Sequence, residues 1–219
     1  MDIEKINKDI EERDRVFKGV QKTIVVFGSA RIHKPGGIGT NKDSIRAESK
    51  TAIEAALSEL ISEDIGKNGK QTFHVVTGGG PGIMEWANEA GKSKTHKSIG
   101  IGIALPFEQG LNKHVVPSRG ATLNYFFTRK TAFLHKAECY VVFPGGFGTL
   151  DELFEITTLM QTGKLQRKKV ILFHNRFWNK LINFQALVDF GMIAQEDLDL
   201  FKVVNDSGKL FEELKFIIE

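Results

Sequence analysis

Cysteine is nearly absent from the sequence, which has one such residue, Cys139, among 219. A single cysteine excludes an internal disulfide and any metal site built from several thiolates. Because Cys139 lies in an apolar run, we expect a buried and unreactive thiol. The six histidines show no HxxxH or HxH spacing of the kind that places two imidazoles on one metal ion. We therefore expect no metal and no other cofactor.

Long apolar runs are also lacking. No stretch approaches the roughly 20 apolar residues that a membrane-spanning helix needs. The first residues, MDIEKINKDIEERDR, are highly charged and do not have the pattern of a signal peptide. We therefore expect a cytoplasmic protein without a membrane partner.

Charge of one sign is not concentrated either, since 30 basic and 27 acidic residues are interspersed and leave a net charge of +3. Proteins that bind nucleic acid usually carry a concentrated basic face, so we expect no nucleic-acid partner. The densest basic run, KLQRKK at 164–169, is interpreted as the solvated end of a helix, where cations suit the helix dipole.

Two familiar nucleotide-binding fingerprints are missing. The stretch GFGTLD at 146–151 lacks the third glycine of GxGxxG, and no GxxxxGK[ST] occurs. Neither dinucleotide binding of that type nor ATP hydrolysis of the P-loop type is therefore supported.

Apolar runs typical of buried strands alternate with segments of helical periodicity along the whole chain. The runs are continuous, which is typical of parallel strands covered on both faces. This alternation predicts an α/β fold with a parallel sheet and helices on both faces. We expect a single domain over 1–219, with a helical extension over 1–20. The predicted strands are 23–27, 73–77, 98–106, 139–143, 169–173 and 201–204, and the predicted helices are 2–19, 44–62, 83–90, 121–137, 149–163, a segment ending near 190, and 207–219.

Three of the predicted strands end in turns of small residues. Phe27 leads into GSA, Thr77 into GGGPG and Phe143 into PGGFGT. In an open parallel sheet, ligands bind beyond the carboxyl ends of the strands, so the three turns are expected at one edge. Helices follow the turns, and the free N–H groups at helix starts favour anions such as phosphate. The alternative is that the glycines only make tight turns.

The segment 121–137, interpreted as one helix, carries an apolar stripe with Lys130 in its middle and Arg129 beside its edge. A lysine on a buried face is costly unless it meets an anion. Two interpretations stay open. Lys130 forms an internal ion pair or extends to solvent, or the helix faces the glycine turns and the lysine binds the ligand. The stripe consists of Leu123, Phe126, Phe127, Phe133, Leu134 and Ala137.

The acidic stretch after the third turn also has two interpretations. Thr149 and Glu152 have the spacing of a capping box, with threonine as the N-cap and glutamate at the third helical position. A carboxylate repels a neighbouring phosphate, however. An acid at this place therefore favours a second role, which is to hold sugar hydroxyls or to act in acid–base catalysis.

The stretch PGGFGTLDE at 144–152 resembles the PGGxGTxxE motif of the family often described as lysine decarboxylase-like. Its members include the LOG proteins, which are cytokinin riboside 5′-monophosphate phosphoribohydrolases, and related nucleotide 5′-monophosphate nucleosidases. The resemblance extends over about 23–190, and the pair RK followed by PGGxGTxxE is specific. The other similar stretches are RK at 129–130, FGSAR at 27–31, TGGGPGIMEWANEAG at 77–91 and LPFEQGLN at 105–112.

The resemblance implies a Rossmann-like nucleotide-binding domain that hydrolyses the N-glycosidic bond of a nucleoside 5′-monophosphate, AMP or a cytokinin riboside monophosphate, to free base and ribose 5-phosphate. Arg129 and Glu152 match the catalytic positions, with Arg129 either orienting Glu152 or holding ribose oxygens. A homodimer or larger assembly of this chain, with the pocket close to the subunit contact, is also implied. The residues implied to bind substrate are Glu108, Lys130, Gly145, Gly146, Phe147, Gly148, Thr149, Asp151 and Thr157.

A second hypothesis is a non-catalytic nucleotide-type binding protein, such as a molybdenum cofactor carrier, which shares the fold and a glycine-rich phosphate site. The presence of both Arg129 and Glu152 favours the enzyme. Decarboxylation of lysine is poorly supported, because it normally needs pyridoxal phosphate on a lysine and nothing in the sequence identifies that lysine. Glu85 and Trp86 put bulk near the second glycine turn, which leaves the identity of the base open.

Overall fold

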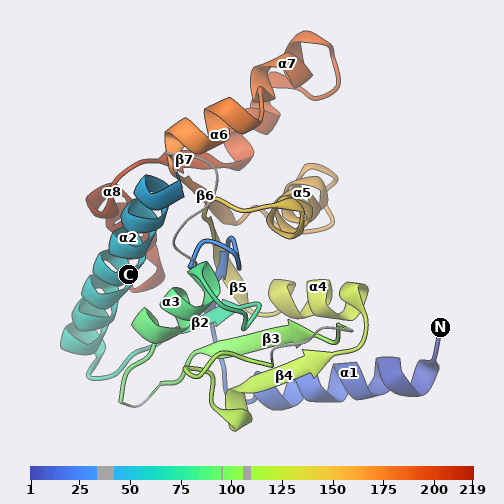
Figure 1. Cartoon of the computed structure of the whole chain (residues 1–219), viewed down its shortest axis with the longest axis vertical. Helices are drawn as coiled ribbons and strands as arrows, with labels where there is room; N and C mark the ends of the chain where they lie inside the picture. The colour runs from blue at the N-terminus through green and yellow to red at the C-terminus, as the bar shows by residue number, and fades with distance from the viewer. Residues whose placement is uncertain (34–41, 95, 106–109) are drawn as a thin grey trace.

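A parallel sheet of seven strands forms the centre of the protein (Figure 1). The computed structural model describes residues 1–33, 42–94, 96–105 and 110–219. The strand order is β4-β3-β2-β1-β5-β6-β7, and every neighbouring pair is parallel. The strands are β1 (Thr23–Phe27), β2 (His74–Thr77), β3 (Ile99–Ile103), β4 (Gly120–Leu123), β5 (Ala137–Val142), β6 (Lys169–Phe173) and β7 (Lys202–Val204).

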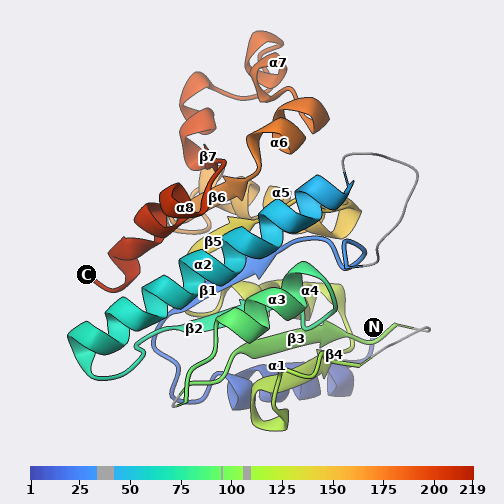
Figure 2. The same ribbon diagram turned by 60° about the vertical axis from the view of Figure 1, so that its left-hand side comes forward.

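Helices cover both faces of the sheet, and each face has its own hydrophobic core. On one face α2, α3 and α8 pack on Ile24 and Val26 of β1, and Figure 2 shows α2 and α3 lying in front of the strands. On the other face α1, α4 and α5 pack on Val25 and Phe27. Neighbouring residues of β1 thus enter opposite cores, as expected for a strand buried on both sides. The predicted α/β class is confirmed. The helices named here are α1 (Ile3–Val16), α2 (Lys42–Asn68), α3 (Ile83–Ala90), α4 (Phe126–Leu134), α5 (Phe147–Gln161) and α8 (Ser207–Leu214).

The order of the strands reverses between β1 and β5. From β1 the chain runs through β2 and β3 to β4 at one edge, then returns to β5 beside β1 and continues through β6 to β7. Connections that lead away in opposite directions leave a crevice at the carboxyl ends of the two central strands, where open parallel sheets bind ligands. Since β2, β1 and β5 are neighbours, the turns after Phe27, Thr77 and Phe143 meet at this edge.

The helix predicted over 121–137 is wrong at both of its ends. Gly120–Leu123 forms β4, which pairs with β3, whereas α4 begins only at Phe126 and Ala137 already belongs to β5. Pairing with a neighbouring strand outweighs the weak helix preference of this short segment. The predicted apolar stripe is wrong in part, because Phe126 and Phe127 are 55% and 43% exposed, whereas Leu123, Phe133 and Ala137 are buried.

The helical segment predicted to end near residue 190 is two helices, α6 (Asn175–Leu181) and α7 (Phe184–Asp189). Between them Ile182 is extended, and the side chain of Asn183 accepts a hydrogen bond from the Ala186 amide at the start of α7. The predicted C-terminal helix is α8 followed by a 3-10 turn at Lys215–Ile217. Across the described ranges, no helix combines the length and the apolar character needed to cross a membrane.

Candidate functional site

A cavity of about 600 Å³ opens at the carboxyl ends of β1, β2 and β5. The turn after β1 contributes residues 27–31, and the turn after β5 with the first part of α5 contributes 145–152. Gly78 lines the cavity from the turn after β2, and α4 contributes Phe126 and Arg129. The three glycine turns that the sequence placed at one edge therefore enclose one space.

Some glycines of these turns are needed because a side chain packs directly against them. A Cβ atom at any of three positions would lie within 3.0 Å of such a side chain. Substitution there would force the neighbouring side chain or backbone to move. The three contacts are Ile83 on Gly28, the Arg129 guanidinium on Gly78, and Thr149 on Gly145.

Gly146 and Gly148 are different, because packing does not explain them. A Cβ atom at either position would meet no described protein atom within 4 Å, apart from neighbouring residues and the helix itself. Both residues line the cavity. Their lack of a side chain keeps the space at the start of α5 open.

The start of α5 leaves backbone donors free. The N-cap is Gly146, which has no side chain to cap the helix, so α5 begins earlier than predicted. The Thr149 amide already donates to the Gly146 carbonyl oxygen at 3.0 Å, which puts Thr149 in the first turn, and the predicted capping box is wrong. Within the described ranges the amides of Phe147 and Gly148 donate to no protein acceptor. They are available to a ligand in the cavity.

Glu152 is the buried acid of this site. Its side chain lines the cavity from the second turn of α5, although the residue is only 6% exposed. Burial raises the pKa of its carboxyl to about 7; the nearby charge of Arg129 opposes this shift, and the charge of Asp151 adds to it. A carboxyl that titrates near neutral pH in a cavity is suited to proton transfer, or to stabilising charge that develops in a reaction.

Arg129 reaches the cavity from α4. Its Nε donates to the Ile101 carbonyl oxygen at 3.2 Å, and its Cζ lies 5.1 Å from the centre of the Phe133 ring. Burial lowers the pKa of the guanidinium, while the charges of Glu152 and Asp151 oppose that shift. Arginine stays protonated in proteins even so. No described carboxylate forms an ion pair with Arg129, so this partly buried cation is suited to an anionic or hydroxyl-rich ligand.

Lys130, the next residue of α4, contacts α5. Its Nζ lies 2.8 Å from Asp151 Oδ1 and 3.2 Å from Glu155 Oε2. Burial lowers the pKa of Lys130, but the hydrogen bonds to the two carboxylates outweigh burial and hold the pKa above its ordinary value. Of the two interpretations left open by the sequence, the structure therefore shows the ion pair. The cation that lines the cavity is Arg129, which is partly buried.

The structure brings together most of the predicted site residues, but not all. Residues 145–149 and Asp151 line the cavity together with Arg129 and Glu152. Thr157 lies further along α5, where its hydroxyl donates to the Leu153 carbonyl oxygen at 3.0 Å. Glu108 lies outside the described residues. Among those that are described, no group of three or more histidine, cysteine or acidic side chains is placed to hold a metal ion.

The sequence placed the turn after β1 at the ligand-binding edge but assigned no role to two of its residues, Ser29 and Arg31, which line the cavity. The Arg31 amide donates to Ser29 Oγ at 3.1 Å, and the Arg31 side chain is exposed. A second guanidinium is thus present at the cavity. The sequence did contain a signal for Ser29 and Arg31, because both lie in the turn after the first apolar run, and this turn was expected at the ligand-binding edge.

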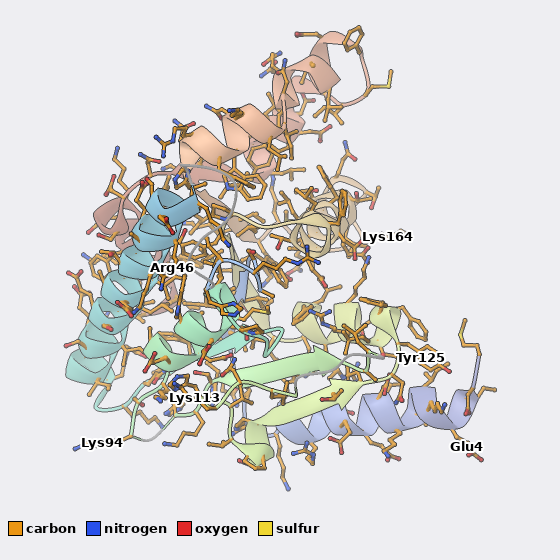
Figure 3. All side chains as sticks on the ribbon, viewed as in Figure 1. Glu4, Arg46, Lys94, Lys113, Tyr125 and Lys164 are labelled. Atoms are coloured by element: carbon orange, nitrogen blue, oxygen red, sulfur yellow. The ribbon has the colours of Figure 1, made fainter. Side chains whose placement is uncertain are left out.

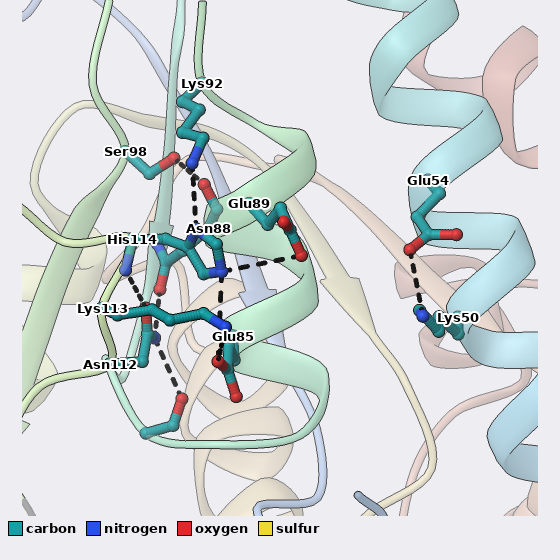
Figure 4. A network of polar contacts seen from close by, with 11 residues as sticks. Lys50, Glu54, Glu85, Asn88, Glu89, Lys92, Ser98, Asn112, Lys113 and His114 are labelled. Atoms are coloured by element: carbon teal, nitrogen blue, oxygen red, sulfur yellow. Dashed lines mark hydrogen bonds and ion pairs between the residues drawn. The ribbon is translucent and has the colours of Figure 1, made fainter.

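A polar network that joins α3 to the segment 110–116 fixes the second glycine turn, the one after β2 (Figure 4). The Asn112 amide donates to the Gly79 carbonyl oxygen at 2.7 Å. The Asn112 side chain donates to the Gly80 carbonyl oxygen at 3.0 Å and to Asn88 Oδ1 at 2.9 Å. These bonds fix the backbone of the turn beside Gly78.

The large side chain that lines the cavity next to this turn is a different one from the two that the sequence suggested, Glu85 and Trp86. Trp86 is buried in the core beside α2, and Glu85 points toward Lys113, 3.8 Å away. Neither is among the described residues that line the cavity. Met84 is, and its sulfur lies where a side chain on Gly78 would be.

Comparison with known proteins gives a consistent picture. The family model described as "Possible lysine decarboxylase" matches residues 83–214, more than half of the chain. A relative in Oryza sativa subsp. japonica, named "Probable cytokinin riboside 5'-monophosphate phosphoribohydrolase LOG4", is 24% identical over 211 residues, which cover 95% of this chain and 83% of the relative. Cytokinin riboside 5'-monophosphate phosphoribohydrolase LOG3 of Arabidopsis thaliana is 24% identical over 168 residues, 76% of each chain.

Among solved structures, the molybdenum cofactor binding protein of the phototrophic bacterium Rippkaea orientalis has a similar fold, with a TM-score of 0.51. The two chains are 18% identical, and the superposition covers 92% of this chain and 99% of the other. At this identity the likeness concerns the fold alone, and it agrees with the Rossmann-like α/β arrangement described above.

Proposed function

This chain belongs to the family described as "Possible lysine decarboxylase", and we propose that it is a nucleotide phosphoribohydrolase, as its named relatives are. The reaction is hydrolysis of the N-glycosidic bond of a nucleoside 5′-monophosphate to the free base and ribose 5-phosphate. The observation that carries the proposal is a buried acid, Glu152, with a pKa of about 7, in the same cavity as an open helix start and the partly buried cation Arg129.

The start of α5 is the proposed site for the 5′-phosphate. The free amides of Phe147 and Gly148 and the positive end of the helix dipole attract an anion. Gly146 and Gly148 leave room for it, because no described side chain occupies the space beside them. Lys130 adds positive charge nearby, although its contacts with Asp151 and Glu155 make it a weaker phosphate ligand than expected from the sequence.

Glu152 and Arg129 are proposed to perform the chemistry. Cleavage of a glycosidic bond proceeds through a transition state with positive charge on the sugar ring. The ionised carboxylate of Glu152 stabilises that charge and takes a proton from the water that attacks C1′. The bond to the base breaks with its electron pair going to the base, which takes up one proton, so that Glu152 is ionised again when the free base and ribose 5-phosphate leave. Arg129 limits the rise in the pKa of Glu152, so a substantial fraction of the carboxyl is ionised at neutral pH.

Decarboxylation of lysine, which the family description suggests, fits the site less well. That chemistry normally requires pyridoxal phosphate bound to a lysine amine. No lysine is among the described residues that line the cavity, and Lys130 is held by two carboxylates. The described lining of the cavity therefore does not fit this cofactor.

A non-catalytic carrier of a nucleotide-type cofactor is the second candidate, favoured by the fold that this chain shares with the molybdenum cofactor binding protein. A carrier needs the open helix start but has no use for a buried acid with a raised pKa. Glu152 is thus the residue that separates the two candidates.

The experiment is incubation of the protein with a panel of nucleoside monophosphates, nucleosides and triphosphates, with the released base measured by chromatography. We expect release from monophosphates, with kcat/KM for AMP at least about tenfold above that for adenosine, because the phosphate contacts are lost in the nucleoside. Binding of nucleotides without release of any base would favour the carrier. Similar kcat/KM values for AMP and adenosine would contradict the proposed phosphate site.

We propose further that the protein is a homodimer that pairs through α4 and α5. Large apolar side chains are exposed at the cavity mouth and beside it, among them Phe126, Phe147 at 92% and Phe154. A second copy of the chain would remove these side chains from water. Light scattering that gives a monomer of about 24.5 kDa at assay concentration would refute the dimer.

A further inference from the structure

Asp9 of α1 is buried in spite of its charge. It is 1% exposed, and within α1 only Asp9 and Val16 are buried. The helix precedes the part of the chain that the family model matches. It lies along β4 and α4, as Figure 1 shows. A buried carboxylate is costly unless several donors surround it, so its partners are informative.

The partners of Asp9 are at the N-terminal end of α4. Oδ1 accepts hydrogen bonds from the side chain and the amide of Asn124 at 2.6 and 2.9 Å. Oδ2 accepts from the Tyr125 amide at 3.1 Å and from the Thr128 hydroxyl at 2.6 Å. Burial alone raises the pKa of Asp9, but these hydrogen bonds outweigh it and hold the pKa below its ordinary value. Asp9 is therefore ionised at neutral pH.

These contacts tie down the start of α4. Tyr125, at the N-cap position of α4, makes no capping hydrogen bond with its own side chain. Asp9, from another helix, accepts from the Tyr125 amide, one of the amides that the helix itself leaves unpaired, and its negative charge lies at the positive end of the α4 dipole. This turn leads directly to the site, because the Arg129 amide donates to the Tyr125 carbonyl oxygen at 3.1 Å.

We propose that Asp9 is a positioning residue of the site, whose buried carboxylate ties down the start of α4 and thereby holds Arg129 in the cavity beside Glu152. Asp9 does not line the cavity itself. The inference rests on the proposed function, in which Arg129 and Glu152 act together. It predicts that loss of the Asp9 charge changes the environment of Glu152, which is on another helix and does not touch Asp9.

The chain offers a matched control in the same helix. Arg15 also anchors α1, but on the side of β4, where its guanidinium donates to the carbonyl oxygens of Pro117 at 3.1 Å and Gly120 at 2.7 Å. A further anchor joins α1 to α4, the Asp2 amide donating to the Tyr125 hydroxyl at 3.0 Å, and Figure 3 shows Tyr125 beside the start of α1. Substitution of Arg15 loosens α1 without removing the contacts of Asp9 with the start of α4.

The test compares Asp9→Asn and Arg15→Gln with the wild type, and uses Thr128→Val as a milder variant should Asp9→Asn fail to fold. The first readout is kcat and KM for AMP with the melting temperature. The second is the pKa of Glu152, measured by titration of its carbon-13 carboxyl signal, which is identified by its absence in Glu152→Gln. The charges of Asp151, Lys130 and Glu155 also act on the pKa of Glu152. To separate the effect of Arg129 from theirs, each variant is also made in an Arg129→Met background.

We expect both Asp9→Asn and Arg15→Gln to lower the melting temperature. Only Asp9→Asn, and Thr128→Val to a smaller extent, should raise the pKa of Glu152 by about 0.5 or more, because Arg129 no longer holds it down. Asp9→Asn should lower kcat about tenfold with KM for AMP little changed. In the Arg129→Met background Asp9→Asn should leave the pKa of Glu152 unchanged.

An unchanged pKa of Glu152 in both Asp9→Asn and Thr128→Val would overturn the inference and leave Asp9 with a purely structural role. An equal shift in Arg15→Gln would do the same, since loosening of α1 would then be the cause. If the wild type releases no base from AMP, the proposed function fails, while the titration still decides whether Asp9 positions Arg129.

Discussion

Replacement of Glu152 by glutamine should make the protein more stable at alkaline pH while it removes most of the activity. The carboxyl lies in a site where burial raises its pKa to about 7, compared with an ordinary value of 4.5. Ionisation of this group is therefore easier in the unfolded chain than in the folded protein. A glutamine of nearly the same size does not ionise in either state.

The sign and the magnitude follow from the two pKa values. Between pH 4.5 and 7 the folded protein holds a proton on Glu152 that the unfolded chain has lost, so stability falls as the pH rises through this range. Above pH 7 the penalty is constant at about 3 kcal/mol. Relative to the wild type, Glu152→Gln should thus gain less than about 1 kcal/mol at pH 5 and about 3 kcal/mol at pH 8.5.

Thermal unfolding of the two proteins at both pH values measures this difference. For a chain of this size, a gain of about 3 kcal/mol corresponds to roughly 6–12 °C in the melting temperature. Glu155→Gln is the matched control on the same helix, because the Glu155 carboxylate is partly exposed and contacts Lys130, so its removal should give no alkaline gain. A constant difference in melting temperature between pH 5 and 8.5 would refute the raised pKa of Glu152.

The activity of Glu152→Gln tests the second half of the prediction. If the carboxylate takes part in glycosidic cleavage, turnover of AMP should fall about 100-fold or more. Binding of AMP should persist or tighten, since a negative charge near the phosphate is removed. A variant that gains stability at alkaline pH but keeps near-normal kcat on every hydrolysed nucleotide would show that Glu152 is buried without being catalytic.

Three further predictions concern the same cavity. Gly148→Ala should raise KM for AMP about tenfold without loss of stability, because its Cβ enters the open space proposed for the phosphate. Gly145→Ala should instead lower the melting temperature, because its Cβ would lie 2.1 Å from Thr149 Oγ1. Normal AMP binding by Gly148→Ala would contradict the phosphate site. The kcat/KM for AMP should rise with pH through an inflection near 7 as Glu152 ionises, and the same inflection in Glu152→Gln would assign it to another group. Dialysis against EDTA should leave turnover unchanged, since no group of metal ligands is present among the described residues, and a loss that magnesium or zinc restores would contradict this.

The central strands could be predicted because their signal is local. The segments 23–27 and 169–173 are short apolar runs, and the structure has strands over these same residues, each followed by a small or polar residue, Gly28 or His174. The edge strand β4 could not be predicted in this way. Gly120–Leu123 has no apolar run, and it is a strand because it pairs with Gly100–Ile103, a contact between segments that are apart in the sequence.

The orientation of the site residues was harder to predict, because the points at which two helices begin cannot be read from the local sequence. If α5 began after Thr149, Glu152 would be the third residue of the helix and would turn back to cap its own N-terminus. The helix begins after Gly146 instead, without any side-chain cap, and Glu152 falls in the buried second turn. In α4 the two neighbouring cations also lie in other places than expected, and the helix starts at Phe126, where a carboxylate from α1 accepts from the Tyr125 amide. Arg129 then enters the cavity and Lys130 contacts α5. The residue types of the site can therefore be read from the sequence, whereas the places of their side chains depend on contacts between segments that are apart in the sequence, such as those of Lys130 with α5 and of Arg129 with β3.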